Sequence, residues 1–358
     1  MTTESANSYR GRIAYIDALR IVACLLVCLH HSVCIYMGTN RPSTLTAATF
    51  TMVGGANLFL MISGALLFPV TRTWREFASR RIGLVAWPLL VWTVVYLVDG
   101  FIHGSKTWSD VLMLPLMPAN SILWYLYLII VVYATMPVVS IVIKAVGRRG
   151  IEAYLVLWVL SALIPFEHGV IHSLQPPQHP LSFFNNCYGY VILGYYLRHW
   201  PLPLLTWRHG WWILALMLLG IVGIPLFEFK MQPSLSWTDH VHAVNNNVSI
   251  NGVMMSALIF TLIQKWVGES YPTPARRRSS SLMVTASKCT FGIYLVHWLL
   301  LERLCAPVLY GLIAGRPEPS TAENLLISIA LATVTFVLSL LVSWMILQLP
   351  FSRRIIGR

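Results

Sequence analysis

The sequence predicts an all-α, polytopic membrane protein with about ten transmembrane helices and with both termini in the cytoplasm. Hydrophobic residues make up 57% of the 358 residues and charged residues only 11%. The mean hydropathy is +0.68, well above that of a soluble domain. Several uninterrupted apolar stretches approach about 20 residues, the length that crosses about 30 Å of hydrocarbon. We therefore expect residues 1–358 to form a single integral-membrane domain, without a separate soluble catalytic domain.

The spans follow one another between short polar or basic connectors. The first begins after a polar cytoplasmic segment, 1–15, and it carries an arginine and no clean small-residue cleavage site, so it is not read as a signal peptide. The fifth and sixth are the shortest, and a basic cytoplasmic tail, 348–358, follows the last. The ten predicted segments are 16–37, 50–70, 83–102, 122–143, 151–165, 183–198, 211–228, 249–267, 287–305 and 324–347.

The distribution of basic residues sets the orientation. With the N-terminus inside, 19 of the 25 Lys and Arg residues fall in the predicted cytoplasmic segments and 5 in the outer ones, with one inside the first span. Basic residues collect on the cytoplasmic side of membrane proteins, so this bias supports both the span count and the direction. The same bias accounts for the net charge of +12, and no basic stripe on a soluble domain indicates nucleic-acid binding.

The first span carries ionisable residues at membrane depth, in the stretch "IDALRIVACLLVCLHHS". Arg20 and His31 lie eleven residues apart, and at about 100° per residue this is within about 20° of three full turns, so the two side chains share a helix face. At about 1.5 Å per residue they stand some 16–17 Å apart along the axis. Asp17 lies one turn before Arg20 and is placed to orient its guanidinium.

Two interpretations of this pair stay open. Arg20 can extend to the interface as a packing and solubility residue, and His31 can be a hydrogen-bonded packing residue. Alternatively, the guanidinium holds the phosphate of a long amphiphilic substrate, and His31 acts as a general base. We favour the functional interpretation, because ionisable residues inside a membrane usually mark a working site.

Other polar residues give weaker signals. The predicted outer loops hold His168, His172, His179, Asp239, His240 and His242. Such a set is compatible with binding a metal or a sugar, but we favour solvated loop residues, because no third ligand is fixed by spacing, and we predict no metal site. The six cysteines fall in or beside apolar runs without a CxxC pattern, and they are read as small buried residues.

Taken in order, several stretches resemble the acyltransferase 3 family of integral-membrane acyltransferases. The first is arginine, ten residues and histidine in the first span. The others are "NLFLMISGALLF" at 57–68, "SRRIGLVAWPLLVW" at 79–92, "ILWYLYLIIVVY" at 122–133, "YVILGYYL" at 190–197 and "TFGIYLVHWLLLE" at 290–302. The set extends over some 280 residues, and ten spans with both ends inside is also the plan expected of this family.

The resemblance implies transfer of an acyl group, often acetyl, from cytoplasmic acyl-CoA to a hydroxyl of an extracytoplasmic glycan or lipid-linked sugar. In these terms His31 matches the essential histidine and Arg20 the essential basic residue. Arg20, Arg80 and Arg81 are then the candidate contacts to the CoA phosphates. Many members have two arginines three positions apart at the third span, whereas Arg80 and Arg81 are adjacent here, so a further phosphate contact is expected from another segment.

The resemblance also indicates several residues that would support the site. Trp124 and Tyr125 are otherwise typical of the interfacial aromatic belt, and Tyr294 and His297 share a face three positions apart. Ser63 and Gly64 indicate close helix packing. The resemblance places the protein in a bacterial plasma (inner) membrane as a multi-pass protein, and it leaves a homo-oligomer open. Direct attack of the acceptor hydroxyl and an acyl-histidine intermediate are both compatible with the sequence.

Two other functions remain as alternatives. A secondary transporter of a small anion or glycan precursor also uses intramembrane Arg and His, but no pair of broken helices or two-half symmetry is visible in the sequence. A lipid-binding sensor or scaffold is the third reading, and it predicts tolerance of substitution at His31.

Overall fold

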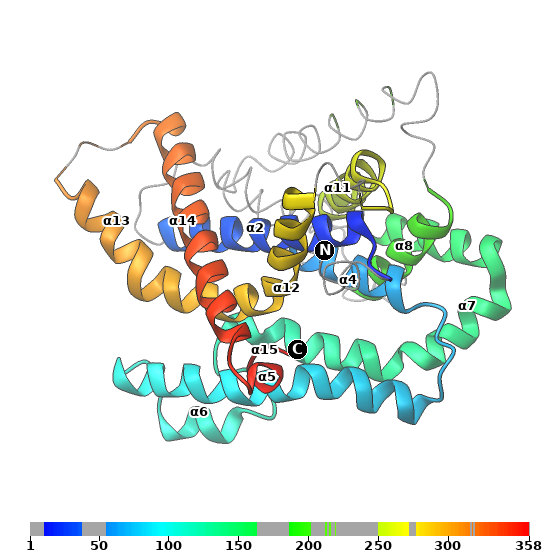
Figure 1. Ribbon diagram of the computed structural model, residues 1–358, viewed down its shortest axis with the longest axis horizontal. Coiled ribbons are helices and arrows are strands. Elements are labelled where there is room, and N and C mark those ends of the chain that lie inside the picture. Colours follow the sequence, from blue (N-terminus) through cyan, green and yellow to red (C-terminus); the bar gives the residue numbers. More distant parts are fainter. Residues whose placement is uncertain are drawn as a thin grey trace, which may run out of the picture.

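The computed structural model describes the chain in several stretches. These are residues 11–37, 55–162, 186–201, 212, 215, 219, 250–271, 277–315, 317 and 319–357. Every regular element within these stretches is helical, as predicted (Figure 1).

The helices differ widely in length. The long ones are α2 (Ala14–Met37), α5 (Trp74–Ile102), α7 (Trp124–Ala162), α11 (Ile250–Val267), α12 (Arg277–Leu300) and α14 (Thr321–Leu347). The shorter ones are α4 (Gly55–Leu67), α6 (Trp108–Met113), η1 (Ser121–Leu123), α8 (Tyr188–His199), the π-helix η6 (Leu301–Cys305), α13 (Ala306–Ile313) and α15 (Ser352–Ile356).

Six helical stretches in the described part are long and apolar enough to cross a membrane. They are Ala14–Tyr36, Trp74–Ile102, Ser121–Ala162, Ile250–Val267, Ser281–Ile313 and Ala322–Leu347. The chain is thus a multi-pass membrane protein. Ten spans and the direction of the termini stay predictions: α4 and α8 match the second and sixth predicted spans but are shorter, and the predicted span 211–228 lies almost wholly outside the described residues.

The fourth and fifth predicted spans fall within one element, α7, which bends sharply at Gly147. This residue has φ 60° and ψ −166°, a conformation that only glycine adopts without strain. The basic pair Arg148 and Arg149 follows directly. In Figure 1, α7 accordingly runs beside α5 and then turns away toward α8.

The first span lies at the centre of the helix packing. α2 contacts α4, α11, α12 and α14, while α5 pairs with α7 at one side of the molecule (Figure 1). Its buried residues explain this position, since Tyr15, Leu19, Ala23 and Cys28 are fully inaccessible to solvent. Two polar side chains of α2, Asp17 and Ser32, are likewise buried between helices.

Two glycines let α4 and α8 approach closely. A Cβ on Gly64 would lie 1.7 Å from the carbonyl oxygen of Val191, and a Cβ on Gly194 would lie 2.0 Å from that of Met61. Neither position accepts a side chain without moving backbone atoms. The close packing predicted for Gly64 is therefore confirmed. Ser63 donates to the carbonyl of Phe59 at 2.9 Å.

Candidate functional site

A cavity of about 790 Å³ opens where the loop after α4, the first turns of α5 and the C-terminal helix α15 meet. Its walls carry four arginines, namely Arg72, Arg80, Arg81 and Arg354. All four are exposed, and Arg354 lies over the ring of Trp87 at 5.5 Å. Such a cluster of exposed guanidinium groups is suited to a multiply charged anion such as a phosphate.

A second cavity of about 360 Å³ adjoins the first and extends between α2, α4, α5, α7 and α12. The two share Leu66, Leu67, Leu84 and Arg81 in their walls. The inner cavity adds one arginine from α2, Arg20. The remaining lining of interest is polar or aromatic: Ser63, Tyr125, Tyr133, Ser287, Lys288, Thr290, Phe291 and Tyr294. A narrow arm that follows a charged head group fits this combination of an arginine-rich entrance and an aromatic interior.

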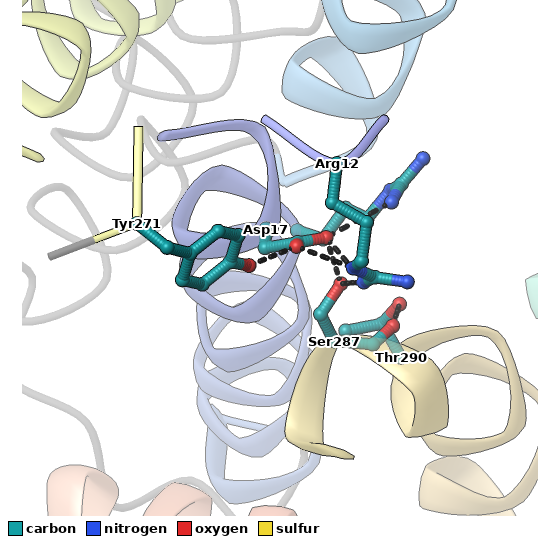
Figure 2. A network of polar contacts seen from close by, with 6 residues as sticks. Arg12, Asp17, Tyr271, Ser287 and Thr290 are labelled. Atoms are coloured by element: carbon teal, nitrogen blue, oxygen red, sulfur yellow. Dashed lines mark hydrogen bonds and ion pairs between the residues drawn. The ribbon is translucent and has the colours of Figure 1, made fainter. Parts of the chain in front are cut away.

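Arg20 is fixed by a buried carboxylate. Asp17 is 1% exposed and accepts from Arg20 Nη1 at 3.2 Å. It also accepts two bonds from Arg12, at 2.6 and 2.9 Å, and one from Ser287 at 2.6 Å. Tyr271 donates to its second oxygen. Figure 2 shows these side chains converging on Asp17 from α2, from α12 and from the segments before α2 and after α11.

The two partners outside the helices respond electrostatically to Asp17. Burial acts to lower the pKa of Arg12, but the hydrogen bonds to Asp17 and its negative charge outweigh this, so the pKa of Arg12 is raised. Burial, followed by the hydrogen bond to the carboxylate, raises the pKa of Tyr271. Arg12 thus stays cationic and Tyr271 stays protonated, which keeps each of them a donor to the carboxylate.

A seam of polar contacts joins α2 to α12. Asp17, Cys24 and His31 are spaced seven apart, which places them on one helix face. Asp17 contacts Ser287, Cys24 donates its Sγ–H to the carbonyl of Thr290, and His31 faces His297. Because the contacts advance along both helices together, α2 and α12 run in the same direction. Arg20 and His31 thus lie along one side of α12.

His31 is surrounded by rings at the far end of this seam. Its imidazole lies 5.0 Å from that of His297 and 5.2 Å from the indole of Trp298, both edge to face, and 5.3 Å from His30. Tyr294, in the wall of the inner cavity, is 6.0 Å from His297. Around His31, the buried atoms His31 Nδ1, His297 Nε2 and Trp298 Nε1 have no hydrogen-bond partner among the described residues.

Apart from Asp17, which holds Arg20 from behind, the predicted site residues fall into three groups. Arg20, Arg81, Tyr125 and Tyr294 line the inner cavity, and Arg80 lines the outer one. His31 on α2 and His297 on α12 lie together, with His297 about one turn beyond Tyr294.

Trp124 forms the third group, since it is 38% exposed and lies outside the lining of both cavities. The centre of its ring lies 6.0 Å from that of Tyr125.

The structure adds residues that the sequence interpretation had not singled out. Arg72 and Arg354 join the arginines of the outer cavity, and Lys288 and Tyr133 join the inner one. Trp298 lies within the stretch 290–302 that resembles the family. Its indole N–H is buried beside a histidine of α2, and this contact between two helices cannot be read from the sequence. The π-helix η6 starts three residues after Trp298, and such insertions are frequent at functional sites.

The described residues contain no group of three or more His, Cys, Asp or Glu side chains arranged to hold a metal ion. The predicted loop residues His168, His172, His179, Asp239, His240 and His242 lie outside the described part of the chain.

The comparisons with known proteins identify a family. The model of one family, described as an acyltransferase domain, matches residues 13–348. No curated protein and no solved structure matches the chain significantly. The matched range includes the seam between α2 and α12, most of both cavities and the His31 cluster. With nearly its whole length matched, the chain belongs to the acyltransferase 3 family of membrane acyltransferases.

Proposed function

We propose that this protein transfers an acyl group, acetyl in the first instance, from cytoplasmic acyl-CoA to a hydroxyl of an extracytoplasmic or lipid-linked glycan in a bacterial plasma membrane. The observation that carries the proposal is a series of neighbouring residues that leads through the two adjoining cavities and then, by ring contacts between Tyr294, His297 and His31, to the proposed base. It starts at the arginines of the outer cavity, passes Arg20, Tyr125 and Tyr294, and ends at His31.

Acyl-CoA suits the two adjoining cavities because its parts differ in charge. The phosphorylated nucleotide end requires cations, which Arg72, Arg80, Arg81 and Arg354 supply. The uncharged arm is long and narrow, and it fits the inner cavity between Tyr125 and Tyr294. Arg72 and Arg354 take the place of the second arginine that the third span lacks. Arg20, fixed by Asp17, is the innermost of these cations.

His31 acts as the general base. Its ring accepts the proton of the acceptor hydroxyl as that oxygen attacks the thioester carbonyl carbon. The carbon–sulfur bond then breaks, CoA leaves as the thiolate, and the proton held by His31 returns to the sulfur. The N–H of Trp298, which is buried and has no partner among the described residues, is available to hydrogen-bond the carbonyl oxygen as negative charge develops there.

Helix packing around His31 keeps bulk water from the thioester. His297 is fully buried, and Val27, Cys28 and Ser32 around His31 on α2 are also inaccessible or nearly so. Exclusion of water favours transfer to the sugar hydroxyl over hydrolysis of the thioester.

Release of free CoA by the purified protein tests this proposal. The full-length protein is reconstituted in liposomes with acetyl-CoA and a glycan acceptor fraction, and free thiol is measured. We expect turnover by the wild-type protein and none by His31→Ala. His103→Ala is the matched control, because its side chain is 45% exposed at the end of α5 and pairs with Asp99. Solute uptake by the wild-type liposomes without CoA release contradicts the proposal and favours a transporter.

Mass spectrometry of surface glycans identifies the acceptor. Cells with the wild-type protein should carry a glycan heavier by one acyl group than cells with His31→Ala. The same glycan mass in both strains, with equal amounts of inserted protein, contradicts a glycan acceptor.

A further inference from the structure

His297 lies directly beside the proposed base, and its hydrogen bonds fix which of its nitrogens carries a proton. His297 Nδ1 is 2.6 Å from the carbonyl oxygen of Tyr294 and 3.2 Å from that of Ile293. A carbonyl oxygen can only accept, so Nδ1 must be the N–H donor. No carboxylate among the described residues forms an ion pair with His297. A fully buried imidazole without a counter-charge is neutral, because burying an unpaired charge is costly. The ring thus has its proton on Nδ1, and Nε2 carries a lone pair.

That lone pair is buried, and no donor among the described residues forms a hydrogen bond to it. His297 is 0% exposed, and its Nε2 has no hydrogen-bond partner among the described residues. His31 Nδ1 is in the same condition, on a ring whose centre is 5.0 Å away. Nearly all buried polar atoms in proteins are paired, so two complementary exceptions on adjacent rings call for a functional explanation.

We propose that His297 is a positioning residue for His31. A small rotation of the two rings, whose centres are 5.0 Å apart, brings them into hydrogen-bond contact. His297 Nε2 then accepts the Nδ1–H of His31 and holds His31 in the tautomer whose lone pair is on Nε2. The inference rests on the proposed function, since it specifies which nitrogen of His31 receives the proton of the acceptor hydroxyl. A proton on Nε2 of His31 instead would place the lone pair toward His297, away from the substrate.

The surroundings support this division of tasks. The backbone of α12 fixes one side of the His297 ring through two carbonyls, three and four residues before it and so about one turn back along the helix, and Nε2 is on the opposite side of the ring. α2 presents His31 on that outward side, at the end of the seam that begins with Asp17 and Ser287. The acceptor atom is thus held by one helix and the base by the other.

Two amide substitutions separate this role from simple packing. In His297→Gln the terminal amide reaches the former position of Nε2 and retains an acceptor there. In His297→Asn the amide reaches only the former position of Nδ1 and retains the bonds to the two carbonyls. We expect His297→Gln to keep kcat within about tenfold of the wild type and His297→Asn to lose roughly a hundredfold or more. The apparent KM for acetyl-CoA should be unchanged in both.

The opposite order, with His297→Asn active and His297→Gln inactive, or equal kcat values in the two variants, overturns the proposal. The result would then assign His297 to packing through its Nδ1–carbonyl bonds.

A readout without catalysis distinguishes this failure from failure of the proposed function. The full-length protein with ring-¹⁵N histidine is studied by NMR in detergent, and the His31 signals are assigned by their loss in His31→Ala. We expect the Nδ1–H tautomer in the wild type and in His297→Gln, and a shift toward Nε2–H in His297→Asn. An Nε2–H tautomer in the wild type contradicts the inference whether or not the protein releases CoA.

Discussion

The substitution Asp17→Asn tests whether one buried carboxylate joins the start of α2 to α12 and to the segment after α11. Asp17 receives hydrogen bonds from Arg12, Arg20, Ser287 and Tyr271. Asparagine has the same size, but it is neutral and replaces one oxygen by an NH₂ group. Because Arg12 donates to both carboxylate oxygens, one of its N–H groups faces another donor whichever way the amide is turned.

The expected loss of stability follows from the burial of the three charges. Removing one partner of a buried ion pair costs about 3–5 kcal/mol, because the remaining charge stays buried and unpaired. The Asp17 side chain is 2% exposed, whereas those of Arg12 and Arg20 are 17% and 29% exposed, so water recovers part of the loss at the guanidinium groups. We therefore expect the lower end, about 3 kcal/mol, or roughly a hundredfold change in the unfolding equilibrium.

Reversible unfolding of the purified protein in mixed detergent micelles measures this change. Glu152→Gln is the matched control, because it removes a carboxylate paired with an arginine, Arg148, in a pair that is 56% and 39% exposed. Exposed pairs contribute little, so this variant should unfold like the wild type. If Asp17→Asn unfolds no more readily than Glu152→Gln, the carboxylate does not join these segments, and the assignment of Asp17 as the residue that fixes Arg20 is wrong.

The remaining predictions concern packing, donor binding and the transition state. Gly64→Ala and Gly194→Ala should each destabilise the protein by about 1–3 kcal/mol or more in the same unfolding assay, because the new methyl group meets backbone atoms. Gly83→Ala should not destabilise the protein, because a Cβ there has nothing within 4 Å. Equal stability of the three variants would contradict the close approach of α4 and α8. Arg81→Ala should raise the apparent KM for acetyl-CoA with little change in kcat. Arg75 is exposed on the same helix and lies outside both cavities, so Arg75→Ala should leave KM unchanged. A similar KM in both variants would exclude Arg81 from the donor site. Trp298→Phe keeps an aromatic ring, though a smaller one, and removes the N–H. It should lower kcat roughly a hundredfold at constant KM; an unchanged kcat would remove Trp298 from the transition state.

The sequence is informative wherever one helix suffices for the argument. Helical periodicity alone places Asp17 beside Arg20 and puts Arg20 and His31 on one side of the first span. The all-helical class follows from the apolar composition. Such a chain crosses lipid, where its backbone N–H and C=O groups must be paired within the protein, and long apolar helices pair them. The same local reasoning predicts the close packing at Gly64.

Features that depend on tertiary packing could not be obtained in this way. Arg354 reaches the outer cavity from the end of the chain, although it is separated by more than 270 residues from Arg81. Trp124 and Tyr125 match the family equally well, but neighbouring residues on a helix point about 100° apart, and only Tyr125 faces the cavity. The bend at Gly147 depends on a positive φ that no hydrophobic pattern reveals.

The role of Trp298 illustrates the same limit at the level of a single atom. The sequence places it beside His297, but the buried state of its Nε1 depends on how α2 lies against α12. The partners of Asp17 likewise come from three separate parts of the chain. A single helix can indicate that a charge is buried, but not which distant residues satisfy it.

A structure of the full-length protein with a non-hydrolysable thioether analogue of acetyl-CoA tests the central claim most directly. The account predicts phosphate density among Arg72, Arg80, Arg81 and Arg354, the arm passing Tyr125 and Tyr294, and the sulfur within reach of the His31 ring. An analogue bound elsewhere, or bound in these cavities with its sulfur separated from His31 by packed side chains, would contradict it.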